Sequence, residues 1–411
     1  MDVSVVVYYF LSLVAIWLGF TSLRGGLRFA AYVRRQMAEF QPHYTPLVSV
    51  IAPFRGVDEN LRQNLSALFE QNYPAYEIVF VTDSANDPGL RIVEEVCAEK
   101  SDNLNTVGTR IVIAGPAADS GQKVHNLQKA VAAIDERSEV IVFVDSDARP
   151  HPNWLRSLVS PLVDETLGAA TGYRWFVASA FSFSAQLRSV WNASITSALG
   201  EVRSQNFCWG GSTAIRRQTF ENLNVIDRWR GTVSDDFALT RVLQEARKPI
   251  KFVPQCLIVS EDSCDLFELL EFTTRQLKIT RVYAPHLWRA VLLGNAHFVL
   301  VFFGGFLLTF WRWWLGLPAT TAFLLAIIFV LGAAKSWIRL NAVELALTNY
   351  GVSLRKDLLW HVLLWPVASA LFLINAIAAA ISRRIKWRGI SYELKSPVEA
   401  VIIARESDSN G

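Results

Sequence analysis

The chain has 411 residues, of which 52 % are hydrophobic and 19 % charged, and its mean hydropathy is +0.26. Soluble domains usually carry about 25 % charged residues, so this composition argues against a wholly soluble protein. The net charge of +3 does not by itself indicate nucleic acid, and we expect no nucleic-acid partner.

Four apolar stretches are long enough to cross a bilayer, which takes about 20 residues of helix. They lie at residues 3–20, 290–310, 315–334 and 358–381. The first has no basic leader and no clear small-residue cleavage site, so we interpret it as a retained anchor and not as a signal peptide. We expect a short turn around Arg312 and Trp313 to join the second and third stretches.

Basic residues predict how the chain crosses the membrane. Arg24, Arg28, Arg34 and Arg35 follow the first stretch, which places the N-terminus outside and the middle region in the cytosol. The same rule would place the basic residues 383–388 outside. Either the rule fails for this tail, or one apolar stretch is re-entrant or interfacial.

The middle region alternates between two kinds of pattern. Short β-rich runs occur at residues 48–52, 77–81, 111–113 and 140–144, separated by helix-like stretches such as 59–71, 88–100 and 124–134. This alternation predicts an α/β fold, a parallel sheet with helices on both faces. Such sheets bind ligands at the carboxyl ends of their strands.

Two of the predicted strands are followed by aspartates. Asp83 and Asp87 come after the second run, and Asp145 and Asp147 come after the fourth. Two carboxylates one residue apart can share Mg²⁺ or Mn²⁺, which leaves positions for phosphate oxygens. An ion held there could neutralise a diphosphate leaving group. An Asp-x-Asp sequence also occurs in ordinary turns, but its place after a strand favours the metal site.

Further candidates lie at the starts of two predicted helices. Asp235 and Asp236 open one of them. Asp235 fits an N-cap in favourable contact with the helix dipole, whereas Asp236 is a candidate general base. Lys123 precedes another helix, where it either contacts a phosphate or is simply solvated.

In this order the motifs resemble those of the family 2 glycosyltransferases of GT-A fold. They are more closely similar to the ceramide glucosyltransferase-like branch, which includes hopanoid-associated bacterial members, over residues 5–395. The residues that carry the resemblance are Val48-Ser49-Val50-Ile51-Ala52-Pro53, Gln71-Asn72-Tyr73-Pro74, Asp83…Asp87-Pro88, Lys123-x-x-Asn126-Leu127, Asp145-Ser146-Asp147, Asp235-Asp236 and Trp387-Arg388-Gly389-x-x-Tyr392. The resemblance implies a Rossmann-like GT-A domain with transmembrane helices at both ends.

The resemblance also implies a role for each acidic residue. Asp83 would contact the nucleotide of a UDP-sugar donor, and Asp87 would lie near it. Asp145 and Asp147 would hold ribose, diphosphate and a divalent cation, Mn²⁺ or Mg²⁺. Asp236 would be the catalytic base of an inverting displacement.

One motif departs from the family pattern. The Gln/Arg-x-x-Arg-Trp motif of the family corresponds to Arg275-Gln276-Leu277-Lys278-Ile279, which has no tryptophan. Arg275 and Lys278 could still supply positive charge to the diphosphate. They also fit the basic face of an amphipathic helix on a membrane surface. The missing tryptophan favours transfer of a single sugar over polysaccharide synthesis.

Together these interpretations predict five parts and one activity. The parts are an N-terminal anchor (1–23), a cytosolic GT-A domain (45–262), interfacial amphipathic helices (263–289), C-terminal transmembrane helices (290–382) and a basic tail (383–411). The expected activity is inverting transfer of one hexose from a UDP-sugar to a lipid hydroxyl. The expected hexose is glucose, and the expected lipid is ceramide. We expect an integral protein of a bacterial inner membrane, with the catalytic domain in the cytoplasm.

Several alternatives stay open at this point. The acceptor could be diacylglycerol or a hopanoid, and the donor another UDP-sugar. A processive polysaccharide synthase fits less well because of the missing tryptophan. A non-catalytic membrane scaffold conflicts with the complete set of carboxylates.

Overall fold

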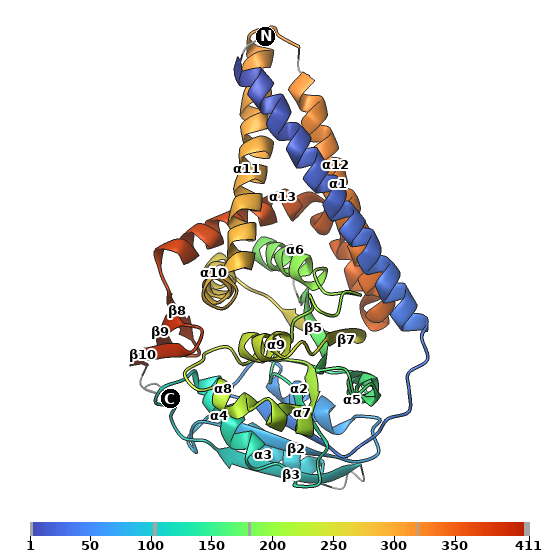
Figure 1. Ribbon diagram of the computed structural model, residues 1–411, viewed down its shortest axis with the longest axis vertical. Helices are drawn as coiled ribbons and strands as arrows, with labels where there is room; N and C mark the ends of the chain where they lie inside the picture. Colours follow the sequence, from blue (N-terminus) through green and yellow to red (C-terminus); the bar gives the residue numbers. More distant parts are fainter. Residues whose placement is uncertain (1–2, 102–104, 180–181, 319, 407–411) are drawn as a thin grey trace. The chain divides into compact units, whose positions relative to one another are not determined.

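A computed structural model describes residues 3–101, 105–179, 182–318 and 320–406. The chain divides into two compact units (Figure 1). Unit 1 comprises Met1–Arg35, Phe176–Ala198 and Glu261–Ser382, and unit 2 comprises Gln36–Trp175, Leu199–Ser260 and Arg383–Gly411. Unit 2 therefore combines the middle of the chain with its C-terminal segment.

Unit 2 is built on a seven-stranded sheet with strand order β3-β2-β1-β4-β6-β5-β7. Strands β1 to β4 pair in parallel, whereas β6 is antiparallel to both β4 and β5. The predicted α/β alternation is confirmed, and the sheet is mixed where we predict only parallel strands. The strands are β1 Val48–Pro53, β2 Tyr76–Thr82, β3 Thr106–Ile113, β4 Val140–Phe143, β5 Ala169–Ala178, β6 Thr213–Arg216 and β7 Ile250–Asp262.

Helices cover both faces of this sheet. Val48 and Val50 of β1 are buried with α2 (Leu61–Phe69), α3 (Leu90–Glu99) and α5 (Trp154–Val159). Ile51, on the opposite face, is buried with α4 (Gln122–Val131), α7 (Arg217–Asn222), α8 (Val225–Arg228) and α9 (Asp235–Glu245). Burial on both faces explains why the central strands are almost continuously apolar.

The C-terminal segment forms a second, three-stranded antiparallel sheet in unit 2. Its strands are β8 (Arg384–Trp387), β9 (Ile390–Ser396) and β10 (Glu399–Arg405). This corrects the expected basic tail, although residues 407–411 lie outside the described part. Alternate residues of β9 are buried, as the two-residue period of a strand requires. The turn between β8 and β9 contains Arg388 and Gly389, both with positive φ (48° and 73°), as a tight hairpin requires.

This second sheet is attached to the first turn of α4. The hydroxyl of the buried Tyr392 accepts a hydrogen bond from the backbone N–H of Gln122 at 3.1 Å. Arg405 donates to Oε1 of Gln122 at 3.0 Å and to the carbonyl of Ala117 at 2.6 Å. The C-terminal strands therefore fix the position of the residue that precedes Lys123.

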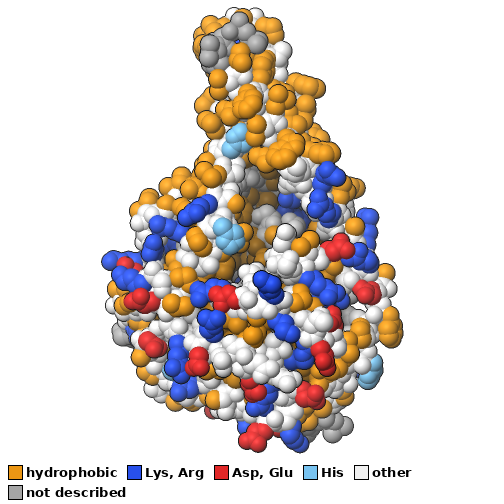
Figure 2. Space-filling view, viewed as in Figure 1, with side chains coloured by type: hydrophobic (Ala, Val, Ile, Leu, Met, Phe, Trp, Pro, Cys, Tyr) orange, Lys and Arg blue, Asp and Glu red, His pale blue; other side chains and the backbone are white. Residues whose placement is uncertain are grey.

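Unit 1 is helical and apolar. Within the described residues, four helices are long and apolar enough to cross a membrane: Val5–Ala38, Pro285–Trp314, Thr320–Ala346 and Thr348–Ile381. Hydrophobic side chains dominate the visible surface of α11 (Pro285–Trp314) (Figure 2). The other three of these four are α1 (Val3–Ala38), α12 (Thr320–Ala346) and α13 (Gly351–Ile381), and unit 1 also contains α6 (Phe183–Thr196) and α10 (Leu266–Tyr283). The four predicted apolar stretches are confirmed as helices of a membrane protein. They cannot all cross the membrane, because residues 384–405 belong to unit 2 and bond to α4, so at most two of α11, α12 and α13 cross it.

Two boundaries in unit 1 differ from the prediction. Helix α1 continues well beyond the apolar stretch 3–20 and the expected anchor boundary at residue 23. Arg312 and Trp313 lie inside α11, so the connection to α12 begins after them. In both places polar or basic residues extend a helix, because a helix does not have to end where its apolar sequence ends.

We predict that Tyr392→Phe lowers the stability of unit 2. The variant keeps the ring but leaves the buried N–H of Gln122 without its acceptor, which costs about 1–3 kcal/mol. Thermal unfolding of the detergent-solubilised protein should show a lower midpoint. Val401→Thr, at a half-exposed position on β10, is the control and should unfold like the wild type. Equal midpoints for Tyr392→Phe and the wild type would contradict the attachment.

Candidate active site

The carboxyl ends of β1, β2 and β4 lie side by side. In the parallel register, Pro53 of β1 pairs with Val81 of β2, and Ile51 pairs with Phe143 of β4. The residues that follow these strands, among them Asp83 and Asp145, therefore meet at one edge of the sheet.

The centre of the site is the side chain of Lys123. Its Nζ lies 2.7 Å from Oδ1 of Asp145 and 3.2 Å from Oδ1 of Asp235. Lys123 comes from the first turn of α4, and Asp235 is the first residue of α9. A hydrogen bond of 2.8 Å from the N–H of Gly121 to the carbonyl of Thr232 holds these two helix starts together.

The pair leaves no room for a side chain at Gly210. A Cβ at this position would lie 2.7 Å from Nζ of Lys123 and 2.5 Å from Oδ2 of Asp235. The small residues of the 208–212 segment thus allow the backbone to approach the buried charges. This close approach of Gly210 is not predicted from the sequence.

Burial and charge have opposite effects on the pKa values here. Burial would lower the pKa of Lys123, but Asp145, Asp235 and Asp236 outweigh it and raise this pKa. Burial would raise the pKa of Asp145, yet Lys123 and Arg174 hold it below its usual value. Burial raises the pKa of Asp235 to about 6, with Lys123 opposing the shift. Lys123 and Asp145 therefore form a charged pair at neutral pH.

Arg174, a residue of β5, binds the second carboxylate of the Asp145-Ser146-Asp147 motif. Its Nη2 lies 2.8 Å from Oδ1 of Asp147 and 3.6 Å from Oδ2 of Asp145. The guanidinium also lies over the ring of Trp209, 5.2 Å from its centroid. Arg174 is a site residue that the sequence analysis missed. The sequence feature that could have identified Arg174 is a basic residue within an otherwise mostly buried strand.

The structure separates the two members of the acidic pair. Asp235 is buried against Lys123, whereas Asp236 is half-exposed. Oδ1 of Asp236 accepts hydrogen bonds from the hydroxyl of Ser234 and from the N–H of Phe237, the latter at 2.7 Å. Ser234 is the N-cap residue of α9, the position expected for Asp235. Of the two carboxylates, that of Asp236 is the more accessible to a substrate.

Asp87 organises loops of the protein. Its carboxylate accepts hydrogen bonds from the backbone N–H of Gly56 at 3.0 and 3.1 Å and from that of Gly89 at 2.7 Å. The hydroxyl of Thr82 donates a further bond at 3.0 Å. These bonds connect the loop after β1 to the loop after β2. The neighbouring Asp83 has Arg55 as its partner, with 3.6 Å between Oδ2 and Nε.

The hairpin turn of the C-terminal sheet brings another cation to the same loops. Arg388 donates to both carboxylate oxygens of Asp58, at 2.7 and 2.8 Å, and to the carbonyl of Arg55 at 3.1 Å. Burial would lower the pKa of Arg388, but Asp58, Asp147 and Asp145 raise it. Arg388 belongs to the motif Trp387-Arg388-Gly389-x-x-Tyr392, and its contact with Asp58 is not predicted from the sequence.

Arg275 and Lys278 lie on α10, in unit 1. The guanidinium of Arg275 lies 5.7 Å from the centroid of the Phe272 ring. Burial lowers the pKa of Lys278. Their role at the diphosphate stays a prediction.

Asp145 and Asp147, the residues predicted to share a metal ion, pair with Lys123 and Arg174 in this structure. Within the described residues, no group of three or more His, Cys, Asp and Glu side chains is arranged to hold a metal ion. Mg²⁺ and similar ions keep waters and take phosphate oxygens besides one or two carboxylates. The two aspartates therefore fit such an ion provided that a substrate completes its coordination.

Comparison with known sequences gives a family. The profile of glycosyl transferase family 21 matches residues 6–400. Hyaluronan synthase of Streptococcus pyogenes is 31 % identical over 136 residues, 32 % of this chain and 30 % of the relative. Ceramide glucosyltransferase 1 of Caenorhabditis elegans is 28 % identical over 118 residues, 29 % of this chain and 24 % of the relative. Each alignment thus spans less than a third of the relative.

Solved structures give more distant matches. A mannosyltransferase from Pyrobaculum calidifontis in complex with GDP-Man and Mn²⁺ is 19 % identical, with a TM-score of 0.46, and the match covers 90 % of this chain and 98 % of that chain. Glucosyl-3-phosphoglycerate synthase from Mycobacterium tuberculosis in complex with Mn²⁺ and UDP-glucose is 16 % identical, with a TM-score of 0.37, and the match covers 61 % of this chain and 80 % of that chain.

The predicted fold class, a GT-A α/β domain with apolar helices at the N-terminal and C-terminal sides, agrees with the observed strand order and the four long apolar helices. The family profile covers nearly the whole length. The chain belongs to glycosyl transferase family 21.

Proposed function

We propose that this protein transfers a single hexose from a UDP-sugar to a lipid hydroxyl, with inversion at the anomeric carbon. The observation that supports this most is the convergence of Lys123, Asp145 and Asp235, with 2.7 and 3.2 Å between the charged atoms. A nucleotide-sugar transferase needs such a charged pocket next to an accessible base. Membership of a glycosyltransferase family supports the same reaction.

The donor would lie along the strand edge. Asp83, which pairs with Arg55, would contact the nucleoside. Asp145 and Asp147 would hold a divalent cation, Mn²⁺ or Mg²⁺, with diphosphate oxygens as further ligands. When bound, this ion neutralises charge on the departing diphosphate.

Three cations of the protein would support the same leaving group. Lys123, Arg174 and Arg388 all carry raised pKa values because carboxylates surround them. They are therefore charged at neutral pH and can donate hydrogen bonds to phosphate oxygens. Held in a largely buried site, they need little reorganisation as negative charge develops.

Asp236 would act on the acceptor. Its carboxylate takes the proton of the acceptor hydroxyl while the acceptor oxygen forms a bond to the anomeric carbon. The bond from that carbon to the diphosphate oxygen breaks on the opposite face, and UDP leaves. One base is sufficient for this displacement, and no covalent intermediate with the enzyme forms.

The proposed acceptor is a lipid, and ceramide is the preferred candidate. The four apolar helices and the similarity to a ceramide glucosyltransferase over 118 residues support this. Diacylglycerol, a hopanoid and sugars other than glucose remain alternatives of the same class. We place the protein in a bacterial inner membrane with unit 2 in the cytoplasm, because a cluster of arginines follows the first apolar stretch.

A second candidate is processive polysaccharide synthesis. The similarity to hyaluronan synthase over 136 residues favours it. The absence of tryptophan after Arg275-Gln276-Leu277-Lys278 favours transfer of one sugar. The two functions differ in product, which is either a monoglycosylated lipid or a polymer.

We predict that the purified protein forms a monoglycosylated lipid when given Mn²⁺, UDP-sugars and a panel of lipids. Mass spectrometry should detect one added hexose, with UDP-glucose and ceramide as the best pair. Polymer as the main product would establish the second candidate instead. No product with any donor and acceptor would contradict both.

We predict that Asp236→Asn lowers kcat by about 10²–10⁴-fold, the usual contribution of a general base. UDP binding, measured by calorimetry, should remain close to that of the wild type because the diphosphate cations are intact. Asp227→Asn is the matched control, since Asp227 is an exposed residue paired with Arg230. Turnover near the wild-type rate in Asp236→Asn would exclude Asp236 as the base.

We predict that Asp147→Asn raises the Mn²⁺ concentration required for half-maximal activity by about tenfold or more, since even the partners of metal ligands contribute about 10–100-fold to affinity. A metal titration at saturating donor measures this. Asp164→Asn, which changes a carboxylate paired with Arg203 at 3.3 Å, should leave the titration unchanged. An unaltered metal requirement in Asp147→Asn would rule out the proposed ligand role.

A further inference from the structure

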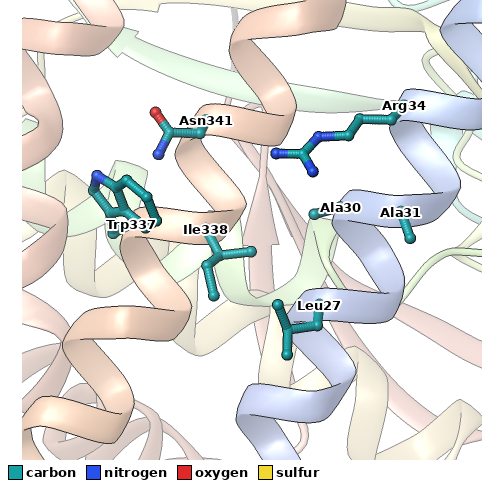
Figure 3. A pocket seen from close by; sticks show the side chains of 7 residues that line it. All are labelled: Leu27, Ala30, Ala31, Arg34, Trp337, Ile338 and Asn341. Atoms are coloured by element: carbon teal, nitrogen blue, oxygen red, sulfur yellow. The ribbon is translucent and has the colours of Figure 1, made fainter.

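A groove of about 600 Å³ runs between α1 and α12, within unit 1 (Figure 3). Most of its lining is apolar, and two residues are polar. Figure 3 shows the guanidinium of Arg34 pointing from α1 toward α12, whereas the amide group of Asn341 points away from Arg34. Leu27, Ala30 and Ile338 form an apolar wall beside Arg34. The complete lining is Leu27, Ala30, Ala31, Arg34, Trp337, Ile338 and Asn341.

Helices α1 and α12 are in close contact on the N-terminal side of the groove residues. A Cβ at Gly19 would lie 3.1 Å from the side chain of Leu331, and one at Gly26 would lie 3.0 Å from that of Lys335. Between these glycines, Nζ of Lys335 donates to the hydroxyl of Ser22 at 2.7 Å. After this contact, the small Ala30 and Ala31 leave the space of the groove unfilled.

The two helices carry a strong excess of positive charge. Between residues 3 and 38 the sequence has no Asp or Glu, and α12 has only Glu344. Glu344 lies 2.6 Å from Nη2 of Arg355, so its charge is already matched. Neither helix therefore contains an anion for the cations Arg24, Arg28, Arg34, Lys335 and Arg339.

The groove lies where charged residues begin along both helices. Arg24 is the first charged residue after the apolar start of α1, and the groove begins one turn later, at Leu27. Lys335 is likewise the first charged residue of α12. Tryptophans such as Trp337 concentrate at the same level in membrane proteins. A cationic groove at this depth faces phosphate groups of lipids.

We infer that this groove binds an anionic phospholipid. The phosphate would lie on Arg34, because a guanidinium binds phosphate oxygens through two parallel hydrogen bonds. One acyl chain would follow Leu27 and Ile338. The site is separate from the carboxylates of unit 2, and the inference holds whichever sugar donor the protein uses.

Native mass spectrometry of the full-length protein in detergent tests this. With phosphatidylglycerol and phosphatidylcholine of identical acyl chains added in equal amounts, we expect retained phosphatidylglycerol. Arg34→Gln should lower its occupancy about fivefold, the contribution of one basic side chain beside anionic lipid. Arg34→Lys should retain part of it. Ile338→Trp fills the groove without a change in charge and should also lower the occupancy.

Arg24→Gln is the matched control. Arg24 lies on the same helix, 5.9 Å from the centroid of the Phe20 ring, outside the groove lining, so occupancy should stay close to that of the wild type. Equal retention of the two phospholipids would overturn the inference. So would equal losses in Arg24→Gln and Arg34→Gln, which would indicate a diffuse charge effect. Displacement of phosphatidylglycerol by neutral ceramide would also overturn it and would assign the groove to the acceptor.

Discussion

The candidate site depends on one buried ammonium group, that of Lys123 between Asp145 and Asp235. Without it, two carboxylates would lie in a largely buried place with too little positive charge, a situation that costs several kcal/mol. The chain meets this constraint with three separate segments: the start of α4, the residues after β4 and the start of α9. The unsubstituted Cα of Gly210 is part of the same constraint, because a Cβ would occupy the space between Lys123 and Asp235.

The C-terminal sheet extends this arrangement to the end of the chain. Tyr392 accepts a hydrogen bond from the N–H of Gln122, next to Lys123, while Arg388 donates to Asp58 and to the carbonyl of Arg55, whose side chain pairs with Asp83. Segments far apart in the sequence thus fix both the lysine and the loop after β1. Residues 384–405 are therefore part of the architecture of the site, although they follow the last apolar helix.

Local sequence pattern predicts the parts of unit 2 that are locally determined. Strands β1, β2 and β4 are recognisable because they are short, continuously buried β-rich runs, and Asp83 and Asp145 are recognisable because they follow such runs. Arg174 and the hydrogen bonds of Asp87 are not, since both depend on long-range pairing. Arg174 enters the site through β5, which is antiparallel to β6, and Asp87 uses the N–H of Gly56 from another loop. The C-terminal sheet is not predicted from the sequence, because its basic residues alternate with buried ones and the segment therefore resembles a charged tail.

The two proposed sites share one feature, which is an excess of charge of one sign among the side chains of each site. In unit 2, Asp58, Asp83, Asp145, Asp147, Asp235 and Asp236 share the positive charges of Arg55, Lys123, Arg174 and Arg388. Carboxylates are in excess there, and the proposed divalent cation would balance them. In unit 1, α1 and α12 have the opposite excess, which an anionic lipid can balance. Because an uncompensated charge is costly wherever it is shielded from water, each excess indicates the sign of the ligand that its site should bind.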